Sequence, residues 1–179
     1  MDDLSELAAH LWAFADQPPT PAARAEVLAA LRHKREGIQS IGAQVLGSWG
    51  GRESIEPLRR WLLECQEREA GWAVRGVAVD QLARLVEGQD AEWILDLYFS
   101  VPGWIAKHEL FPLVRALKPD VARPRLVAAL RDPDWTNRHA AVKAIGNMAF
   151  HDRRRLLLPL VDDPNHNVQK SARFLSREA

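Results

Sequence analysis

The stretch RDPDWTNRHAAVKAIG at 131–146 decides the fold, because its pattern returns 31 residues later as DDPNHNVQKSARFLSR at 162–177. Both stretches open on a turn with a proline, continue with an aromatic residue or a histidine, and then carry a polar residue and an alanine. The matched pairs are Pro133 and Pro164, Trp135 and His166, Arg138 and Gln169, and Ala141 and Ala172. A constant spacing of this length is typical of a repeat architecture in which each repeat is one supersecondary unit.

Extending the same spacing toward the N-terminus finds three more copies, in 101–117, 70–85 and 35–50. The column three residues after the aromatic position, which we call the basic column, holds Gln39, Arg75, Lys107, Arg138 and Gln169. Its members lie 36, 32, 31 and 31 residues apart. The sequence therefore predicts five repeats.

Each repeat contains two segments whose apolar residues recur at three- and four-residue steps, and the first segments align between repeats, with Leu95, Leu126 and Leu157 in one column. This spacing predicts two amphipathic helices per repeat, which we call helix A and helix B, and leaves few residues for strands. A proline in the turn ends helix A, and Asp134 or Asn165 is placed to cap helix B.

A single helical hairpin cannot bury its apolar face, whereas stacked hairpins bury it against one another. We therefore expect an all-α solenoid of five stacked hairpins, with a capping helix at 3–15, in one domain that spans 1–179. The repeats are expected at about 22–50, 52–87, 90–117, 119–149 and 151–178. A column of small residues is expected where neighbouring B helices approach each other: Gly42, Ala78, Ala141 and Ala172.

The segments DPDWTNRHAAVKAIGNM at 132–148 and DDPNHNVQKSARFL at 162–175 resemble the HEAT-repeat family, in particular its short bacterial type first associated with phycobilisome lyases. The resemblance extends over about 22–178 and weakens toward the N-terminus. It implies an α-solenoid with A helices outside and B helices lining a concave face. It implies no single activity, because such repeats serve as scaffolds, adaptors, chromophore-lyase components, immunity proteins and, in a related group, DNA glycosylases.

The composition excludes several classes of protein. The formal net charge is zero, so no overall attraction to nucleic acid or membrane is expected, although 1–101 carry a net charge of −6 and 102–179 a net charge of +6. Such an asymmetry would orient a partner or another copy of the chain, but chance drift of surface charge is the explanation that we favour. Cys65 is the only cysteine and is expected to be a packing residue. No secretion signal and no apolar run of membrane-spanning length is present, which favours a cytoplasmic protein without membrane contact.

Aromatic and basic residues recur along the B helices and form the candidate site, for which two structural alternatives stay open. Tryptophan and arginine are the residues most enriched at protein-binding hot spots, and aromatic residues among basic ones also suit nucleic acid. Alternatively, the basic column bonds to the turns between helices, at Asp132 or Asp163, and the tryptophans fill the wedge between repeats. The candidate partner-binding residues are Trp72, Arg75, Trp104, Lys107, His108, Trp135, Arg138, His139 and Lys143.

The sequence contains no catalytic motif, and we predict no cofactor and no metal site. Asp80, two turns after Trp72, is the only candidate acid for a glycosylase-like reaction, and its neighbours are not strongly basic. The function favoured by the sequence is therefore a non-enzymatic scaffold or adaptor that binds another protein in the helix-B groove. The alternatives are a nucleic-acid-binding or DNA-glycosylase-like protein, and a lyase or chaperone subunit for a pigment-bearing protein.

Overall fold

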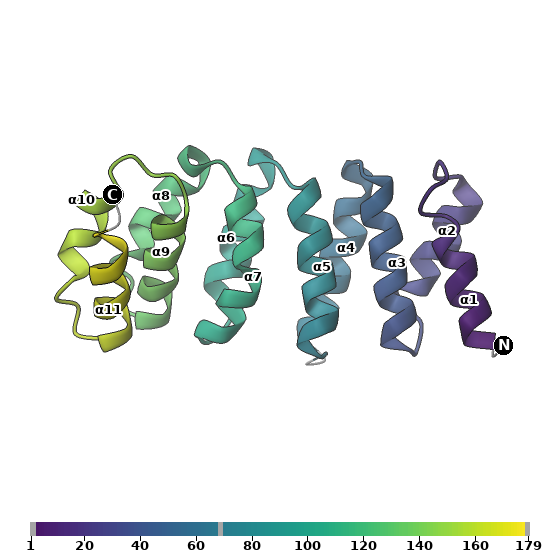
Figure 1. Cartoon of the computed structure of the whole chain (residues 1–179), viewed down its shortest axis with the longest axis horizontal. Helices are drawn as coiled ribbons and strands as arrows, with labels where there is room; N and C mark the ends of the chain where they lie inside the picture. Colours follow the sequence, from purple (N-terminus) through teal and green to yellow (C-terminus); the bar gives the residue numbers. More distant parts are fainter. Residues whose placement is uncertain (1–2, 68–69, 178–179) are drawn as a thin grey trace. The chain divides into compact units, whose positions relative to one another are not determined.

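The computed structural model describes residues 3–67 and 70–177, and this part of the chain is all α, without a strand (Figure 1). Eleven α-helices and three short 3-10 helices make up the regular structure of these residues. After the first helix, the chain forms five helical hairpins in succession, which confirms the predicted all-α repeat architecture.

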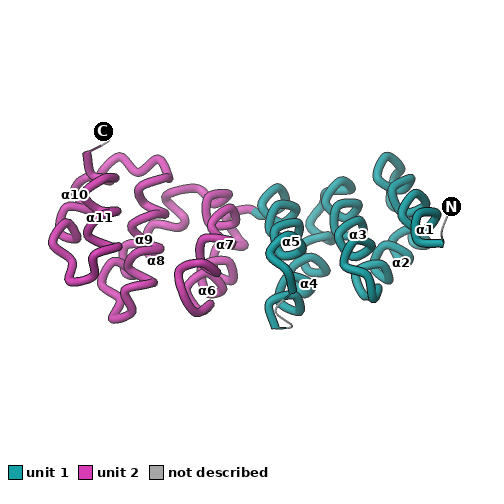
Figure 2. The backbone as a smooth tube through the Cα atoms, turned by 60° about the horizontal axis from the view of Figure 1, so that its bottom comes forward, with its two compact units in different colours: residues 1–86 teal, residues 87–179 magenta. Residues whose placement is uncertain are grey.

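The chain divides into two compact units, residues 1–86 and residues 87–179 (Figure 2). In the first unit, α3 packs against α1, α2 and α5, so that the two hairpins and the N-terminal helix share one core. The prediction that all 179 residues fold as one domain stays a prediction. The helices of the first unit are α1 (Asp3–Trp12), α2 (Pro21–Ala30), α3 (Glu36–Trp49), η1 (Arg52–Ser54), α4 (Ile55–Glu67) and α5 (Trp72–Leu85).

In the second unit, the B helices α7, α9 and α11 stack in chain order, with α9 in contact with both of the others. The A helices α6 and α8 pack against each other and against α7 and α9 respectively, which is the arrangement of an α-solenoid. The helices of the second unit are η2 (Gly88–Asp90), α6 (Ala91–Ser100), α7 (Trp104–Ala116), α8 (Pro119–Ala129), α9 (Trp135–Asn147), α10 (Arg153–Leu157), η3 (Leu158–Leu160) and α11 (His166–Leu175).

The predicted helix caps are present in the last two hairpins. The Asp134 side chain accepts a hydrogen bond from the backbone N–H of Thr136, and the Asn165 side chain accepts from those of Asn167 and Val168. These bonds pair donors that every helix start leaves without an intrahelical acceptor. In the α6–α7 turn, Gly103 takes the capping place with φ +75°, a conformation that residues with a Cβ rarely adopt.

The predicted column of small residues is fully buried at Ala78, Ala141 and Ala172. At Gly42, however, the close neighbour is helix A of the same hairpin, because an added Cβ would lie 3.0 Å from the Cβ of Ala30. The tightest glycine contacts between neighbouring B helices occur one turn later, at two glycines that occupy equivalent repeat positions. They are Gly47, which faces Gln81 of α5, and Gly146, which faces Leu175 of α11.

The rest of the core agrees with the periodicity. Cys65 is fully buried in α4, as expected for a packing residue. The capping helix α1 buries Leu11, and the residues after it are held by Trp49, whose indole N–H donates to the carbonyl oxygen of Phe14 at 2.8 Å. This contact anchors the N-terminal helix to helix B of the first hairpin.

Candidate functional site

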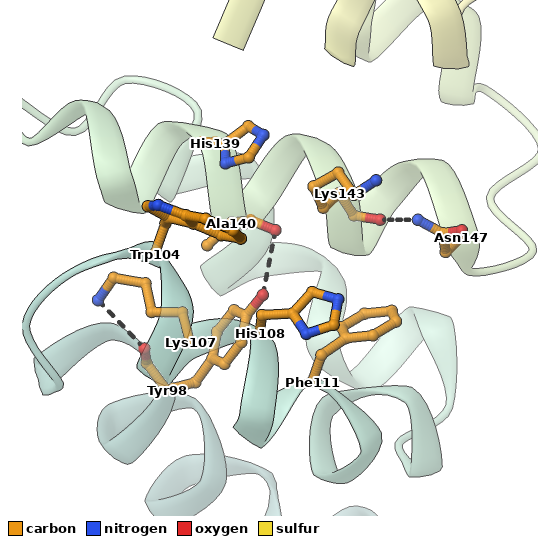
Figure 3. A pocket seen from close by; sticks show the side chains of 9 residues that line it. All are labelled: Tyr98, Trp104, Lys107, His108, Phe111, His139, Ala140, Lys143 and Asn147. Atoms are coloured by element: carbon orange, nitrogen blue, oxygen red, sulfur yellow. Dashed lines mark hydrogen bonds between the residues drawn. The ribbon is translucent and has the colours of Figure 1, made fainter. Parts of the chain in front are cut away.

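A pocket of about 340 Å³ lies in the second unit between the B helices α7 and α9 (Figure 3). Its lining is mostly apolar; we call Tyr98, Phe111 and Ala140 the floor of the pocket, and Trp104 lies beside them. The Tyr98 hydroxyl donates to the carbonyl oxygen of Ala140 at 3.3 Å, which ties helix α6 to α9 beneath the pocket. Burial raises the pKa of Tyr98, so the phenol stays neutral and the floor carries no charge.

The rim of this pocket is polar and cationic. His108 comes from α7, and His139, Lys143 and Asn147 come from α9, where their four-residue spacing places them on one face. The Asn147 amide donates to the backbone carbonyl oxygen of Lys143 at 2.7 Å. The side chain of Lys143 is exposed. No Asp or Glu is among the described residues that line the pocket.

His139 is the best fixed group of the rim. Its Nε2 lies 3.0 Å from the Ser171 hydroxyl on α11, and the Trp135 ring lies 6.3 Å away on the preceding turn of α9. Burial, together with the charge of Lys143, lowers the pKa of His139. The imidazole is therefore held neutral at physiological pH, as a hydrogen-bonding group between α9 and α11.

A second hollow, of about 560 Å³, continues from the first along α9 and α11 and shares His139 and Lys143 with it. Lys170, Arg173 and Arg177 add three more cations, and again no acidic side chain is among its described lining residues. The Arg173 guanidinium already has partners within the fold, because it donates to the Val161 carbonyl oxygen at 2.9 Å and to the Asp162 carboxylate at 3.3 Å. We call the joined surface of these two hollows the helix-B surface of the second unit.

The basic column has a structural task in four of the five hairpins. Each side chain donates to a carbonyl oxygen of the turn between helix A and helix B of its own hairpin. These carbonyls have no intrahelical donor, so a donor from the second turn of helix B satisfies them. The pairs are Gln39 with His33, Arg75 with Ala70, Lys107 with Val101, and Arg138 with Asp132 and Pro133.

Lys107 is the extreme case, since its side chain is buried although the sequence placed it in the groove. Its ammonium donates to the carbonyl oxygen of Tyr98 at 3.3 Å (Figure 3), and also to those of Phe99 at 3.0 Å and Val101 at 2.6 Å. Burial lowers the pKa of Lys107, while the charges of Asp134 and Asp132 act in the opposite direction. The ammonium therefore caps the end of α6.

Arg138 also reaches the next hairpin. Its Nε and Nη2 donate to the two carboxylate oxygens of Asp163 at 2.8 and 3.0 Å. This fork geometry is the strong form of the arginine–carboxylate pair. The ladder to the inter-helix turns, one of the alternatives left open by the sequence, is therefore present at Arg138.

The tryptophans do not fill a wedge between repeats in the way that buried residues would. Trp104 is 50% exposed and Trp72 is 76% exposed, whereas Trp135 is half-buried. Exposed tryptophans are costly to leave in water and are enriched where proteins bind each other.

The structure thus brings Trp104, Lys107, His108, His139 and Lys143 together at one pocket. Trp135 borders it through His139, Arg138 is turned toward Asp163, and Trp72 and Arg75 lie on α5 of the first unit. Sequence reasoning missed Tyr98, Phe111 and Asn147. The signal was present for Phe111 and Asn147, which follow His108 by three residues and Lys143 by four on the same helix faces.

Among the described residues, no group of three or more His, Cys, Asp or Glu side chains is arranged to hold a metal ion. None of the described helices combines the length and the apolar character needed to cross a bilayer. Asp80, the acid considered for a glycosylase reaction, is exposed on α5.

No family model matches the chain, and no curated protein matches it. Among solved structures, the chain is similar to a designed armadillo repeat protein, with 16% identity, a TM-score of 0.47, and coverage of 98% of this chain and 94% of that one. A second designed armadillo repeat protein, in complex with the peptide (KR)4, gives 16% identity, a TM-score of 0.46, and coverage of 97% and 92%. An engineered protein gives 16% identity and a TM-score of 0.42, over 99% and 98% of the two chains.

Proposed function

We propose that this chain is a non-enzymatic scaffold that binds a segment of another protein on the helix-B surface of its second unit. The observation that carries the proposal is the pocket between α7 and α9, where half-exposed Trp104 stands beside a mostly apolar hollow that is open to solvent and reaches Phe111. An aromatic side chain beside an apolar hollow with a polar rim is the usual anatomy of a binding hot spot.

Residues within the predicted site take different parts in this proposal. Trp104, His108, His139 and Lys143 are the contact residues, with Phe111 added. Lys107 and Arg138 support the surface from below, since their charged groups are bonded within the fold. Trp72 and Arg75 belong to the first unit, and their part in binding stays a prediction.

The assignment of the hairpins to the HEAT type is also part of the proposal. It is supported by the Asp or Asn caps that follow Pro133 and Pro164, and by the bonds of Arg138 to its own turn and to Asp163. The cytoplasmic location predicted from the sequence belongs to the proposal as well.

Selection from a displayed library of random peptides tests the function. Immobilised wild-type protein is expected to enrich peptides that the Trp104→Ala variant no longer retains. Ile105→Ala is the matched control, because Ile105 is 61% exposed on the same helix but does not line the pocket. If no peptide depends on Trp104, the surface is not a protein-binding site.

Nucleic-acid binding is the second candidate, and the cations of the α9–α11 hollow favour it. Binding to phosphates would weaken steeply as salt rises, because each neutralised phosphate releases counterions. Titration of a labelled single-stranded oligonucleotide at several salt concentrations measures this slope. Tight binding with a steep slope, lost in Lys143→Glu, would replace the scaffold proposal with a nucleic-acid one.

A further inference from the structure

We infer that the partner segment is acidic and carries one apolar anchor residue, whose side chain enters the α7–α9 pocket while its carboxylates lie along α9 and α11. The inference rests on the proposed function and names the chemistry of the ligand at the same surface.

The anchor follows from the shape and lining of the first pocket. At about 340 Å³, this pocket lies at the low end of the range of roughly 300–1,000 Å³ found for small-ligand sites, and its floor of Tyr98, Phe111 and Ala140 offers no charge. The ammonium of Lys107 is withdrawn beneath this floor to the carbonyls that end α6. A carboxylate placed at the floor would therefore lose its hydration without gaining a partner, whereas a leucine or aromatic side chain would bury apolar area.

The acidic character follows from the groups that surround the anchor. Lys143 stands where the two hollows meet, and Lys170, Arg173 and Arg177 continue the cations along α11. The described lining residues of both hollows include no carboxylate, and of these four cations Arg173 is paired with a carboxylate outside the lining, that of Asp162 at 3.3 Å. A neutral or basic segment would bury the Lys143 and Lys170 ammonium groups without an anionic partner, while an acidic one would pair with them, so charge complementarity selects the acidic segment.

A peptide fits these features better than a nucleic acid does. The aromatic groups line a concave hollow instead of forming the row of exposed faces on which successive bases stack. The chain as a whole has a formal net charge of zero, which gives no long-range attraction to a polyanion. The cations are confined to one short stretch, as one acidic segment requires.

The experiment extends the peptide selection with charge variants. Wild-type protein is expected to enrich peptides in which Asp or Glu residues flank one Leu, Ile, Phe or Trp. A synthetic peptide of that consensus is then measured by fluorescence anisotropy, beside copies with Gln for each acid and with Ala for the apolar residue. Each copy is expected to bind about tenfold more weakly or worse, as is common when a hot-spot contact is removed.

Lys143→Glu and Lys170→Glu are expected to weaken the consensus peptide by a similar factor, and both side chains are exposed, so the fold should tolerate the change. Lys118→Glu is the control, because Lys118 is exposed in the same unit but lies outside both hollows. The inference is overturned if the Trp104-dependent peptides are neutral or basic, or if Lys143→Glu and Lys170→Glu both bind the acidic peptide like wild type; the scaffold function would survive either result. Selection of no Trp104-dependent peptide overturns both.

Discussion

Arg138 joins two hairpins through one guanidinium, which donates backward to the carbonyl oxygens of Asp132 and Pro133 and forward to both carboxylate oxygens of Asp163. The side chains of the Arg138–Asp163 pair are only 14% and 6% exposed, so water competes weakly for these bonds. The pair is therefore a partly buried ion pair that links α9 to the turn before α11.

Arg138→Ala is expected to lower the free energy of unfolding by at least about 1.5–3 kcal/mol, the range for hydrogen bonds to a charged group, since it also leaves the Asp163 carboxylate without its partner. Thermal and urea unfolding measure the loss. Arg138→Lys, which keeps the charge but not the planar fork, should recover only part of it. If the alanine variant is as stable as wild type, the Arg138–Asp163 ion pair does not contribute to stability.

The same pair predicts an acid dependence of stability. The side-chain hydrogen bond from Arg138 lowers the pKa of Asp163 from its ordinary value of 3.8. Because the folded pKa lies below the unfolded one, the stabilisation is complete above about pH 4 and is lost as the pH falls through the folded pKa. Urea unfolding between pH 5 and the acid limit of folding, for wild type and Asp163→Asn, should show a shallower decline in the variant. If the free energy of unfolding falls equally with pH in both proteins, Asp163 is not the source of the acid dependence.

Lys107→Met is expected to destabilise the α6–α7 hairpin while the stem still packs. The substitution leaves the carbonyls of Tyr98, Phe99 and Val101 without their ammonium donor, and one buried acceptor left unpaired costs about 1–3 kcal/mol. Lys143→Met is the matched control, because the Lys143 side chain is exposed. Unfolding measurements should separate the two, and hydrogen exchange should show earlier opening at the end of α6 in the Lys107 variant only.

Gly146→Ala is expected to destabilise the contact between α9 and α11. The new methyl group would meet Leu175 at 2.4 Å from Cδ1 and 2.9 Å from Cβ, so a change of leucine rotamer alone cannot clear it. Overpacking of this kind costs about 1–3 kcal/mol, against a gain in helix propensity of about 1 kcal/mol.

Gly76→Ala is the control for that experiment. Gly76 lies inside α5 with no neighbouring atom within 4 Å of the added methyl, so only the gain in helix propensity remains and the variant should melt higher than wild type. A Gly146 variant that also melts higher would mean that α11 moves aside without loss.

The sequence was sufficient for the repeats, the helix pairs and the caps at Asp134 and Asn165, because these depend on spacing and on local turn chemistry. It could not predict where the charged end of a long side chain lies. Periodicity placed Lys107 on the groove side of helix B, but a flexible stem lets its ammonium fold back to the unpaired carbonyls of α6. Gly42 was read as a contact between B helices for a similar reason, since spacing identifies a buried position but not its neighbour.

The pocket itself also lay beyond the sequence. Tyr98 belongs to α6, a helix A, and reaches Ala140 of α9 because both α6 and α9 pack against α7. The periodicity of one helix does not predict a contact that depends on three helices. Phe111 lies on the predicted face of α7, yet its role as floor depends on the separation of α7 and α9, which follows from the packing of both helices.

In the first four hairpins, the basic-column residue bonds to the turn of its own hairpin, so each of these repeats supplies the donor for its own turn carbonyls. A hairpin gained or lost as a whole would bring or remove both the carbonyls and the donor that satisfies them, from Gln39 with His33 to Arg138 with Asp132. Such a chain can change length by duplication or deletion of complete hairpins without leaving orphaned backbone groups behind. The contacts between hairpins, such as the bonds of Arg138 to Asp163 and of Arg123 to Asp152, would have to be matched anew at the junction.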